Sequence, residues 1–336
     1  MNTHSWGNNV PLNFLTFIRD GSKFLVAGHK EPDGDCAWSQ LAVSSLLRRL
    51  GKEVVPCSAG PFKRPEVKPY ESYFTSSPSA SGDPRSGDLR LIVVDCAYQD
   101  RIGDLYPLVQ GLPTAIIDHH LPNDCPPWSG NGPRYVDTHA PATSFLVLNL
   151  IFALGMKPSK EEAELLFLGL CTDTGFFRHV DSTGAATFEA ASILIDAGAN
   201  PKAAFAAING GKSLDSRKLL AHVLSRAECF FDGKLIISSE ELEETKRFGL
   251  EGRDSDSLYQ LLQSVEGVEA IVVIRQESPS NCTVGLRSRD QVDVRSIAAA
   301  FGGGGHKNAA GLSIAGTIAE LTPRFIKAFQ PVFTAK

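Results

Sequence analysis

A chain of 336 residues is longer than most single domains, so two domains are expected. Hydrophobic residues make up 43% of the chain and charged residues 21%, a balance that is typical of globular proteins and excludes extended disorder. The formal net charge of −5 excludes the broadly basic surface that a long nucleic-acid duplex requires, so any phosphate-bearing substrate must be held by a local positive patch or by metal ions.

The cysteines and the apolar runs limit the compartment in which the protein works. The seven cysteines are Cys36, Cys57, Cys96, Cys125, Cys171, Cys229 and Cys282. No Cys-x-x-Cys pair occurs, which disfavours a disulfide framework or a structural zinc site and predicts small buried side chains in a reducing interior. The N-terminus lacks a basic stretch followed by an apolar run, and no apolar run approaches about 18 residues. We therefore expect a cytoplasmic protein without a signal peptide or a membrane span.

The first half of the chain alternates short apolar strands with helical stretches. Strands are expected at 24–27, 53–56, 89–94 and 114–117, and helices at 39–50, 140–154 and 160–170. Gly51 is expected to cap the carboxyl end of the first of these helices. Buried apolar strands separated by helices predict an α/β fold with a doubly wound, mainly parallel sheet.

The second half predicts a helical connection and a smaller α/β domain. Residues 183–228 have a mostly helical pattern, interrupted by Gly198 and by Gly210-Gly211. Strands are then expected at 234–238, 270–274 and 283–289, and a helix at 294–301. We therefore predict a first domain over 1–190, a helical linker over 191–228 and a second domain over 229–336.

Side chains that can bind a metal ion follow the ends of four apolar segments of the first half. These side chains are His29, Asp33 and Asp35, then Asp95, then Asp118, His119 and His120, and finally Asp173. Because open α/β sheets place ligand sites at the carboxyl ends of their strands, the four segments are expected to meet at one edge. Oxygen and nitrogen ligands without a thiolate favour manganese or magnesium over structural zinc.

Each of these segments also has a purely structural interpretation. Asp33-Gly34-Asp35 is typical of a turn or a helix N-cap, and a carboxylate at a strand end is common in loops. Asp118-His119-His120 could form a hydrogen-bonded surface cluster. Their joint occurrence at the ends of successive strand–helix units favours a shared metal site over coincidence.

The ordered motifs resemble those of the DHH phosphoesterase superfamily. They are His29-x-x-x-Asp33-Gly34-Asp35, Val94-Asp95, Asp118-His119-His120 and Thr172-Asp173-Thr174-Gly175, and the segment 302–311 resembles the accompanying DHHA1 domain. The compact two-domain form is similar to nanoRNase/pAp-phosphatase-type proteins and to stand-alone phosphodiesterases for linear or cyclic dinucleotides. The chain is too short for a RecJ-like exonuclease and lacks the membrane segments of the large cyclic-dinucleotide phosphodiesterases.

The resemblance implies a role for each residue of the motifs. One divalent ion would be held by His29, Asp33 and Asp95, and a second by Asp35, Asp95, His119 and Asp173. Two such ions, expected to be Mn²⁺ with Mg²⁺ as the alternative, can activate a nucleophile and stabilise charge on phosphoryl oxygens. The catalytic residues would be Asp95, His119 and His120, although His120 either contacts the phosphate or supports its loop. Asp118 would orient an imidazole from behind the ligands.

Trp38 departs from the family pattern, in which the residue before Ser39 is usually small and often glycine. In one interpretation, the indole narrows the pocket or stacks on a base. In the other, it packs against a neighbouring helix.

The second domain supplies candidate phosphate contacts. Gly303, Gly304 and Gly305 lie in a run of four glycines that ends at His306 and can bring backbone amides close to an anion, although a flexible hinge has the same composition. Arg287 and Arg289 are two apart on an expected strand, so both can point into one cleft, with a solvated strand face as the alternative for one of them. By the resemblance, this domain binds the nucleotide. Arg178 is a further candidate contact, whereas Phe176 and Phe177 are expected in the core.

The sequence thus predicts two-metal, Mn²⁺-dependent hydrolysis of phosphoester bonds in short RNA, linear dinucleotides and 3′-phosphoadenosine 5′-phosphate (pAp). The alternatives are a cyclic-dinucleotide phosphodiesterase, an inorganic pyrophosphatase or exopolyphosphatase, and a non-catalytic nucleotide sensor. The glycine-rich domain disfavours a pyrophosphatase, and the complete ligand set disfavours a sensor. The expected partner is a short RNA or a small nucleotide, with neither a long duplex nor a membrane. The oligomeric state stays open, a homodimer included.

Overall fold

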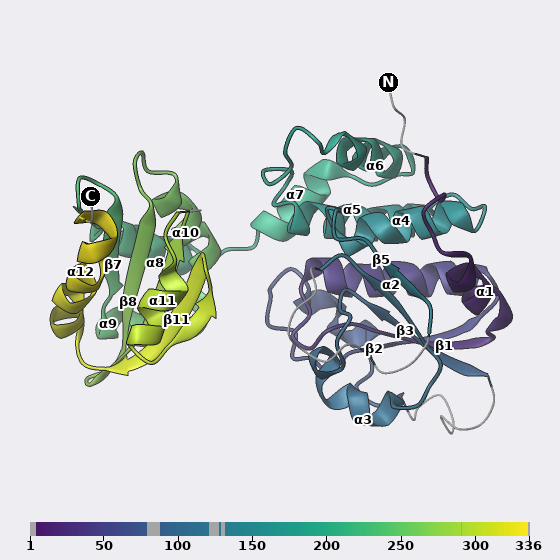
Figure 1. The fold of residues 1–336 in the computed structure, drawn as a ribbon, viewed down its shortest axis with the longest axis horizontal. Coiled ribbons are helices and arrows are strands. Elements are labelled where there is room, and N and C mark those ends of the chain that lie inside the picture. Colours follow the sequence, from purple (N-terminus) through teal and green to yellow (C-terminus); the bar gives the residue numbers. More distant parts are fainter. Residues whose placement is uncertain (1–4, 79–87, 121–127, 129–131, 290, 335–336) are drawn as a thin grey trace. The chain divides into compact units, whose positions relative to one another are not determined.

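The computed structural model describes residues 5–78, 88–120, 128, 132–289 and 291–334. The chain forms two compact units, Met1–Gly210 and Gly211–Lys336 (Figure 1). Helix α7 (Pro201–Asn209) is the last element of the first unit, and α8 (Leu214–Ser225) is the first of the second. The boundary therefore lies within the segment 191–228 that was expected to link the domains, and the helices of that segment are divided between the two units.

A five-stranded sheet forms the centre of the first unit, with the strand order β2-β1-β3-β4-β5. The strands are β1 (Lys23–Ala27), β2 (Glu53–Cys57), β3 (Leu89–Val94), β4 (Thr114–Asp118) and β5 (Arg134–Val136). All neighbouring strands are parallel, which confirms the predicted parallel sheet. The carboxyl ends of β1, β3 and β4 therefore lie at the same edge.

Helices cover both faces of this sheet, which makes it doubly wound (Figure 1). One face packs against α1 (Leu12–Asp20), α2 (Gly34–Arg49) and α4 (Thr143–Ala153). Helix α5 (Lys160–Asp173) packs on α2 and α4, and α6 (Ala185–Asp196) packs on α4 and α5, so these two helices form a further layer. The 3₁₀ segment η3 (Gln99–Leu105) and α3 (Tyr106–Val109) pack on the other. Alternate strand residues enter the two cores, as Val26 and Ile92 face the helices and Leu25 and Leu91 face η3 and α3.

Helix α2 begins at Gly34, whereas the sequence predicted a loop here and a helix only from residue 39. Its N-cap is Asp33, whose side chain accepts a hydrogen bond from the amide of Cys36 at 3.1 Å. Glycine and aspartate weaken a helical pattern, yet they suit the first turn of a helix, where the acidic groups face its positive end. Asp35 and Cys36 therefore project from the rigid start of a buried helix.

The second unit contains a six-stranded mixed sheet with the order β10-β11-β9-β8-β7-β6. Its strands are β6 (Glu228–Phe230), β7 (Leu235–Glu240), β8 (Ala270–Ser278), β9 (Asn281–Ser288), β10 (Gly304–His306) and β11 (Ala309–Ala315). Only β7 and β8 are parallel neighbours within this sheet. Helices α11 (Val294–Ala300) and α12 (Ile318–Thr334) pack on one face, and α8, α9 (Leu242–Phe248) and α10 (Ser255–Gln263) pack on the other.

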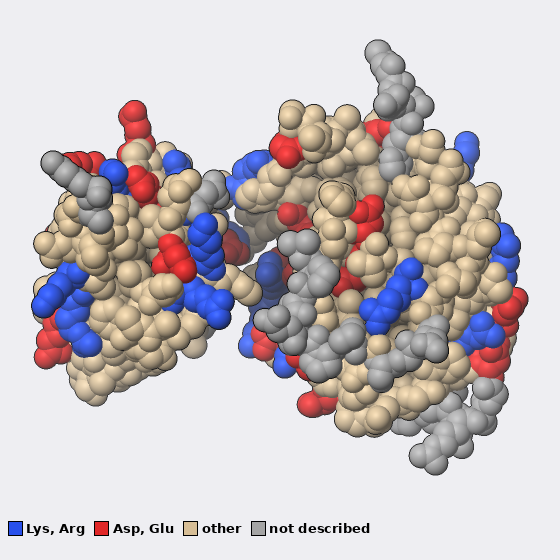
Figure 2. Space-filling model, in the orientation of Figure 1, with Lys and Arg blue, Asp and Glu red and all other residues tan. Residues whose placement is uncertain are grey.

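The surfaces of both units carry charges of both signs. Figure 2 shows lysine and arginine interspersed with aspartate and glutamate on the face of each unit that is in view. Among the described residues, no helix has the length and apolar character needed to cross a membrane.

Candidate metal centre

The carboxyl edge of the first sheet brings together all six candidate metal ligands. His29 follows β1, Asp95 follows β3, and His119 follows β4. The remaining three belong to helix ends: Asp33 is the N-cap of α2, Asp35 lies in its first turn, and Asp173 is the last residue of α5. Four segments that are distant in the sequence thus meet at the edge where the sequence predicted a metal site.

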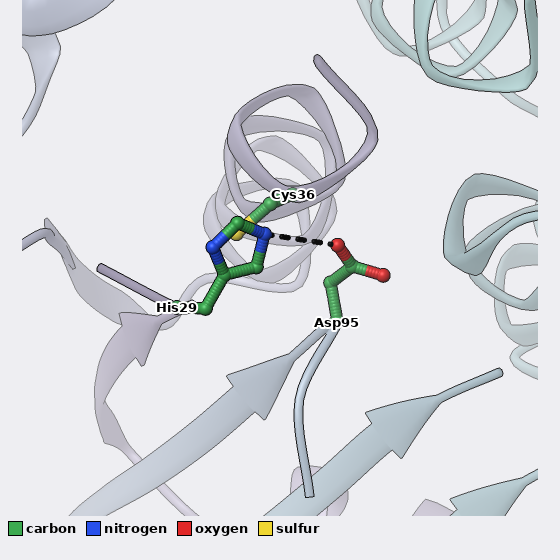
Figure 3. Close-up of side chains that lie close together, drawn as sticks. All are labelled: His29, Cys36 and Asp95. Carbon is green, nitrogen blue, oxygen red and sulfur yellow. Dashed lines mark ion pairs between the residues drawn. The ribbon is translucent and has the colours of Figure 1, made fainter. Parts of the chain in front are cut away.

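His29, Asp33 and Asp95 form the first group of candidate ligands. His29 Nε2 lies 3.7 Å from Asp33 Oδ1. The same nitrogen lies 3.5 Å from Asp95 Oδ2 (Figure 3). The other ring nitrogen, Nδ1, lies 2.9 Å from the carbonyl oxygen of Lys30, so it is suited to donate there while Nε2 faces the carboxylates. Separations of 3.5 Å or more are too long for good hydrogen bonds, so His29 Nε2 faces one carboxylate oxygen of each aspartate without a close contact to either.

Asp35, His119 and Asp173 form the second group, and their ligand atoms all lie within 4.8 Å of one another. His119 Nε2 lies 3.1 Å from Asp173 Oδ2 and 3.7 Å from Asp95 Oδ1. Its Nδ1 lies 3.2 Å from the carbonyl oxygen of Ala140, the same arrangement as in His29. The two oxygens of Asp95 therefore face different groups, Oδ2 toward His29 and Oδ1 toward His119.

Asp95 is held in an uncommon backbone conformation. Its φ is +62°, in the left-handed region that costs a non-glycine residue about 1–3 kcal/mol. Its amide donates to the carbonyl of Ile117 at 2.9 Å, and the hydroxyl of Thr143 donates to Asp95 Oδ1 at 2.7 Å. Neighbouring elements thus stabilise the strained position that directs this carboxylate between the two groups.

Asp35 connects α2 to the start of α4. It accepts hydrogen bonds from the amides of Thr143 at 2.6 Å and Ser144 at 3.0 Å. The methyl group of the N-cap residue Ala142 cannot accept these hydrogen bonds, so Asp35 caps the helix in its place. Helix α5 approaches closely as well, because a Cβ on Gly169 would lie only 2.8 Å from Asp35 Oδ1. The carboxylate is therefore positioned by two backbone donors and by close packing.

The cluster concentrates negative charge in a buried place. Burial raises the pKa of Asp35 well above its ordinary value, and the charges of Asp95 and Asp173 raise it further. Burial likewise raises the pKa of Asp95. Burial lowers the pKa of His119, but its hydrogen bond with Asp173 and the nearby carboxylates outweigh this effect and raise the pKa to about 10. Divalent cations would replace the protons that the cluster retains, so the donor set fits such ions.

Asp118 contacts His120 rather than His119. Asp118 Oδ1 lies 2.8 Å from His120 Nδ1 and accepts the His120 amide at 3.1 Å. This hydrogen bond raises the pKa of His120, against the opposite effect of burial. The ring of His120 is half-exposed and lies 3.8 Å from Asp95 Oδ1. The imidazole that Asp118 orients is therefore the half-exposed one, and its ligand atom lies within 4.8 Å of those of Asp95 and His119.

Trp38 is fully buried, at 0% exposure. Its ring packs edge-to-face on Tyr70 of the 3₁₀ segment η1 (Lys68–Tyr73), with centroids 5.8 Å apart. Gly34 makes room for it, since a Cβ there would lie 2.4 Å from the indole. The packing interpretation is the one that this structure supports.

The turn after Asp173 carries Arg178 and two phenylalanines. Gly175, Phe176 and Phe177 have φ values of +54°, +54° and +68°. Both phenylalanine rings pack against the core of the first unit, as expected. Arg178 is exposed, and its Nε donates to the carbonyl of Gly175 at 2.9 Å.

In the second unit, Arg287 and Arg289 both lie against α10. The guanidinium of Arg287 stacks over the ring of Tyr259 at 4.6 Å, and that of Arg289 donates to the carbonyl of Gln263. Arg287, Ala309 and His306 are direct neighbours across β9, β11 and β10, so their side chains share one face of the sheet. The structure thus presents two cations and an imidazole on the same side.

The glycine run forms a tight turn from α11 into the edge strand β10. Gly302 and Gly305 have φ values of +82° and +142°, which other residues rarely adopt. A Cβ on Gly303 would lie 2.5 Å from the side chain of Leu312, whereas Gly304 has open space around it. Because β10 is an edge strand, one side of its backbone stays unpaired within the sheet.

Comparisons with known proteins agree with this arrangement. Residues 23–170 match the DHH family, N-terminal domain, and residues 232–335 match the DHHA1 domain. The bifunctional oligoribonuclease and PAP phosphatase NrnA of Thermus thermophilus is 32% identical over 305 residues, covering 87% of this chain and 84% of that protein. The chain belongs to the DHH/DHHA1 phosphoesterase family.

Two further relatives extend the match. The NrnA of Bacillus subtilis (strain 168) is also named a bifunctional oligoribonuclease and PAP phosphatase. It is 30% identical to this DHH protein over 292 residues, which cover 85% of this chain and 87% of that protein. The crystal structure of an exopolyphosphatase-related protein from Bacteroides fragilis has a TM-score of 0.80, covers 96% of both chains and is 24% identical. This likeness confirms the fold.

Cys36 lies beside this DHH centre but was not singled out by the sequence analysis. The ligand atoms of His29, Cys36 and Asp95 all lie within 4.8 Å of one another (Figure 3). Burial raises the pKa of the Cys36 thiol to about 11. Of the other described cysteines, Cys229 is exposed and the rest are buried, whereas Cys125 lies outside the described residues. The available signal was the position of Cys36 directly after Asp35, which becomes informative once the helix is known to begin at Gly34.

Proposed function

We propose that this protein is a phosphoesterase that uses two divalent ions, with Mn²⁺ preferred, to hydrolyse short RNA, linear dinucleotides and pAp. The observation that carries the proposal is the position of Asp95, whose two oxygens face separate groups of candidate ligands. The activities named for the two NrnA relatives, oligoribonuclease and PAP phosphatase, support the choice of substrates.

In this proposal, His29, Asp33 and Asp95 hold one ion, and Asp35, Asp95, His119 and Asp173 hold the other. When bound, such a pair of ions supplies Lewis-acid stabilisation of phosphoryl charge and a nucleophile at neutral pH. The protein itself fixes the ligands: Ala140 and Lys30 orient the two imidazoles through their carbonyl oxygens. The hydrogen bond with Asp118 raises the pKa of His120, which favours the protonated ring, and this ring donates a hydrogen bond to a phosphoryl oxygen of the substrate.

The second unit would recognise the nucleotide. Arg287 and Arg289 offer guanidinium groups that suit phosphate oxygens, and their contacts with α10 limit the freedom that binding would otherwise remove. The amide of Gly303 already donates to the carbonyl of Ala298 at 2.9 Å, so Gly303 would serve mainly to shape the turn. His306 and the backbone amides of Gly304 and Gly305 would add hydrogen-bond donors at the sheet edge. Arg178 of the first unit would contact a phosphate near the ions. The mixed charges of both units favour substrates that need only these local contacts (Figure 2).

A substrate panel tests the proposal. Purified protein is supplied with Mn²⁺ and given a linear dinucleotide, a five-nucleotide RNA, pAp, a cyclic dinucleotide, pyrophosphate and an RNA of about twenty nucleotides. We expect the linear dinucleotide, the short RNA and pAp to be hydrolysed fastest, and the long strand slowly at physiological salt. Turnover of pyrophosphate alone, or of the cyclic dinucleotide alone, would replace this proposal with the corresponding activity.

A further inference from the structure

Cys36 places a sulfur atom beside the first group of candidate metal ligands. Figure 3 shows the thiol of α2 next to the ring of His29, with Asp95 on the side of the ring marked by the ion pair. The ligand atoms of these three residues fit within 4.8 Å, and all three residues are buried. They come from the end of β1, the first turn of α2 and the end of β3, which are rigid elements.

The packing around Cys36 keeps its sulfur in this position. A Cβ on Gly28 would lie 2.3 Å from Cys36 Sγ, so the residue before His29 must be small for the thiol to lie there. The side-chain amide of Gln40 donates to the same sulfur at 3.4 Å, one helical turn along α2. Cys57 and Cys282 are equally buried, yet neither belongs to a group of His, Cys and Asp ligands among the described residues.

The three side chains form a donor set that differs from that of the second group. Thiolate, imidazole and carboxylate together suit thiophilic cations such as Zn²⁺ and Co²⁺, whereas Mn²⁺ and Mg²⁺ favour oxygen. The first group by itself offers only the imidazole of His29 and the carboxylates of Asp33 and Asp95, and Cys36 adds a sulfur atom to it. The cysteine thus changes which cation the group can prefer.

We propose that Cys36 is a metal-specificity residue, through which the His29–Asp95 position accepts a thiophilic divalent cation in competition with Mn²⁺. As the bond from sulfur to the cation forms, the S–H bond of Cys36 breaks and its proton passes to bulk water. This inference rests on the proposed metal role of His29 and Asp95, and extends it to the choice of ion.

Titration of metal-free protein with Co²⁺ tests the inference without any substrate. A thiolate ligand gives a charge-transfer absorption band in the near ultraviolet, which oxygen and nitrogen ligands lack. We expect the wild type to develop this band in proportion to one bound Co²⁺. Cys36→Ser and Cys36→Ala should lose the band, and the matched control Cys57→Ser should keep it. Circular dichroism establishes that each variant is folded.

Competition between ions provides a second readout. Cys36→Ser should weaken Zn²⁺ binding by at least roughly tenfold, the smallest loss that changes around metal ligands commonly cause, and should leave Mn²⁺ binding unchanged. Absence of the Co²⁺ band in the wild type, or its persistence in both Cys36 variants, overturns the inference. Protein that shows the band but hydrolyses none of the panel would instead contradict the proposed function. Hydrolysis without the band would contradict only the role of Cys36.

Discussion

Replacing Asp118 with asparagine removes the charge behind His120 while nearly preserving the shape of the side chain. The asparagine oxygen can still accept from His120 Nδ1 and from its amide, at the positions that Asp118 Oδ1 now holds at 2.8 and 3.1 Å. The amide nitrogen must then replace Oδ2, which is buried and has no hydrogen-bond donor among the described residues. The substitution therefore acts on the protonation of His120 and, separately, on folding.

The magnitude follows from the type of hydrogen bond. A hydrogen bond to a charged group is worth about 1.5–3 kcal/mol and a neutral one about 0.5–1.5 kcal/mol. The change thus removes about 1–1.5 kcal/mol, and kcat/KM for a dinucleotide should fall roughly five- to twelvefold. Because Asp118 raises the pKa of His120, the variant should also lose activity at lower pH than the wild type as the pH increases. The buried amide should lower the free energy of unfolding by about 1–3 kcal/mol.

The assay is a pH profile of kcat/KM between about pH 6 and about 9, the range over which a perturbed histidine loses its charge. Asp137→Asn is a matched control, because Asp137 precedes His139 by two residues, as Asp118 precedes His120. Asp137 Oδ1 lies 3.5 Å from the ring Nδ1 of His139, but the side chain of His139 is 97% exposed. That variant should leave the profile unchanged. An Asp118→Asn protein that folds and keeps both the wild-type rate and the wild-type pH profile would refute the role given to His120.

Three further predictions address other parts of the molecule. Gly285→Ala should weaken dinucleotide turnover and spare a small generic ester, because its Cβ would lie 2.1 Å from the hydroxyl of Tyr259, on whose ring Arg287 stacks. Gly311→Ala is the control, because its Cβ would lie 3.4 Å from the nearest atom, a backbone oxygen. Equal losses of turnover in the two variants would contradict this prediction. The raised pKa of His119, about 10 in the folded protein against 6.5 as the ordinary value, means that its contribution to stability is fully present below pH 6.5 and is lost as the pH increases toward 10. Melting temperatures of metal-free protein should therefore fall over this range while Mn²⁺ affinity, measured by calorimetry, rises; a Mn²⁺ affinity independent of pH would argue against His119 as a ligand. Glu244→Ala should lower the free energy of unfolding by about 2–3 kcal/mol, because this buried carboxylate accepts two hydrogen bonds from Arg226. These contacts lower the pKa of Glu244 and so stabilise only its ionised form. Urea titration should therefore show the loss above pH 4.5 and little of it in acid.

The sheet of the first unit was largely predictable because each buried strand is a continuous apolar run. β1 ends two residues before His29, β3 ends directly before Asp95, and β4 ends at Asp118, so the sequence located both the strands and the ligands that follow them. β5, β6 and β10 were missed because three residues are too few to show a period, and their pairing depends on neighbouring strands.

The contacts within the site were less predictable than its members. Asp118 orients His120 and not His119. The reason is that the Nδ1 of His119 already contacts the carbonyl oxygen of Ala140, which belongs to a separate segment. The burial of Trp38 depends on Tyr70, which packs on it from a distant part of the chain. The sequence predicts Cys36 only as a small buried residue, because nothing local shows that α2 turns its sulfur toward His29.

The most direct test of the two-ion account is the number of Mn²⁺ ions bound by wild-type protein and by Asp95→Ala, measured together with dinucleotide turnover. Because Asp95 faces both ligand groups, the wild type should bind two ions tightly and hydrolyse the dinucleotide. Folded Asp95→Ala should lose affinity at both positions and lose hydrolysis with it. A folded Asp95→Ala protein that keeps two tightly bound ions, or that hydrolyses the dinucleotide at a substantial rate, would contradict the account.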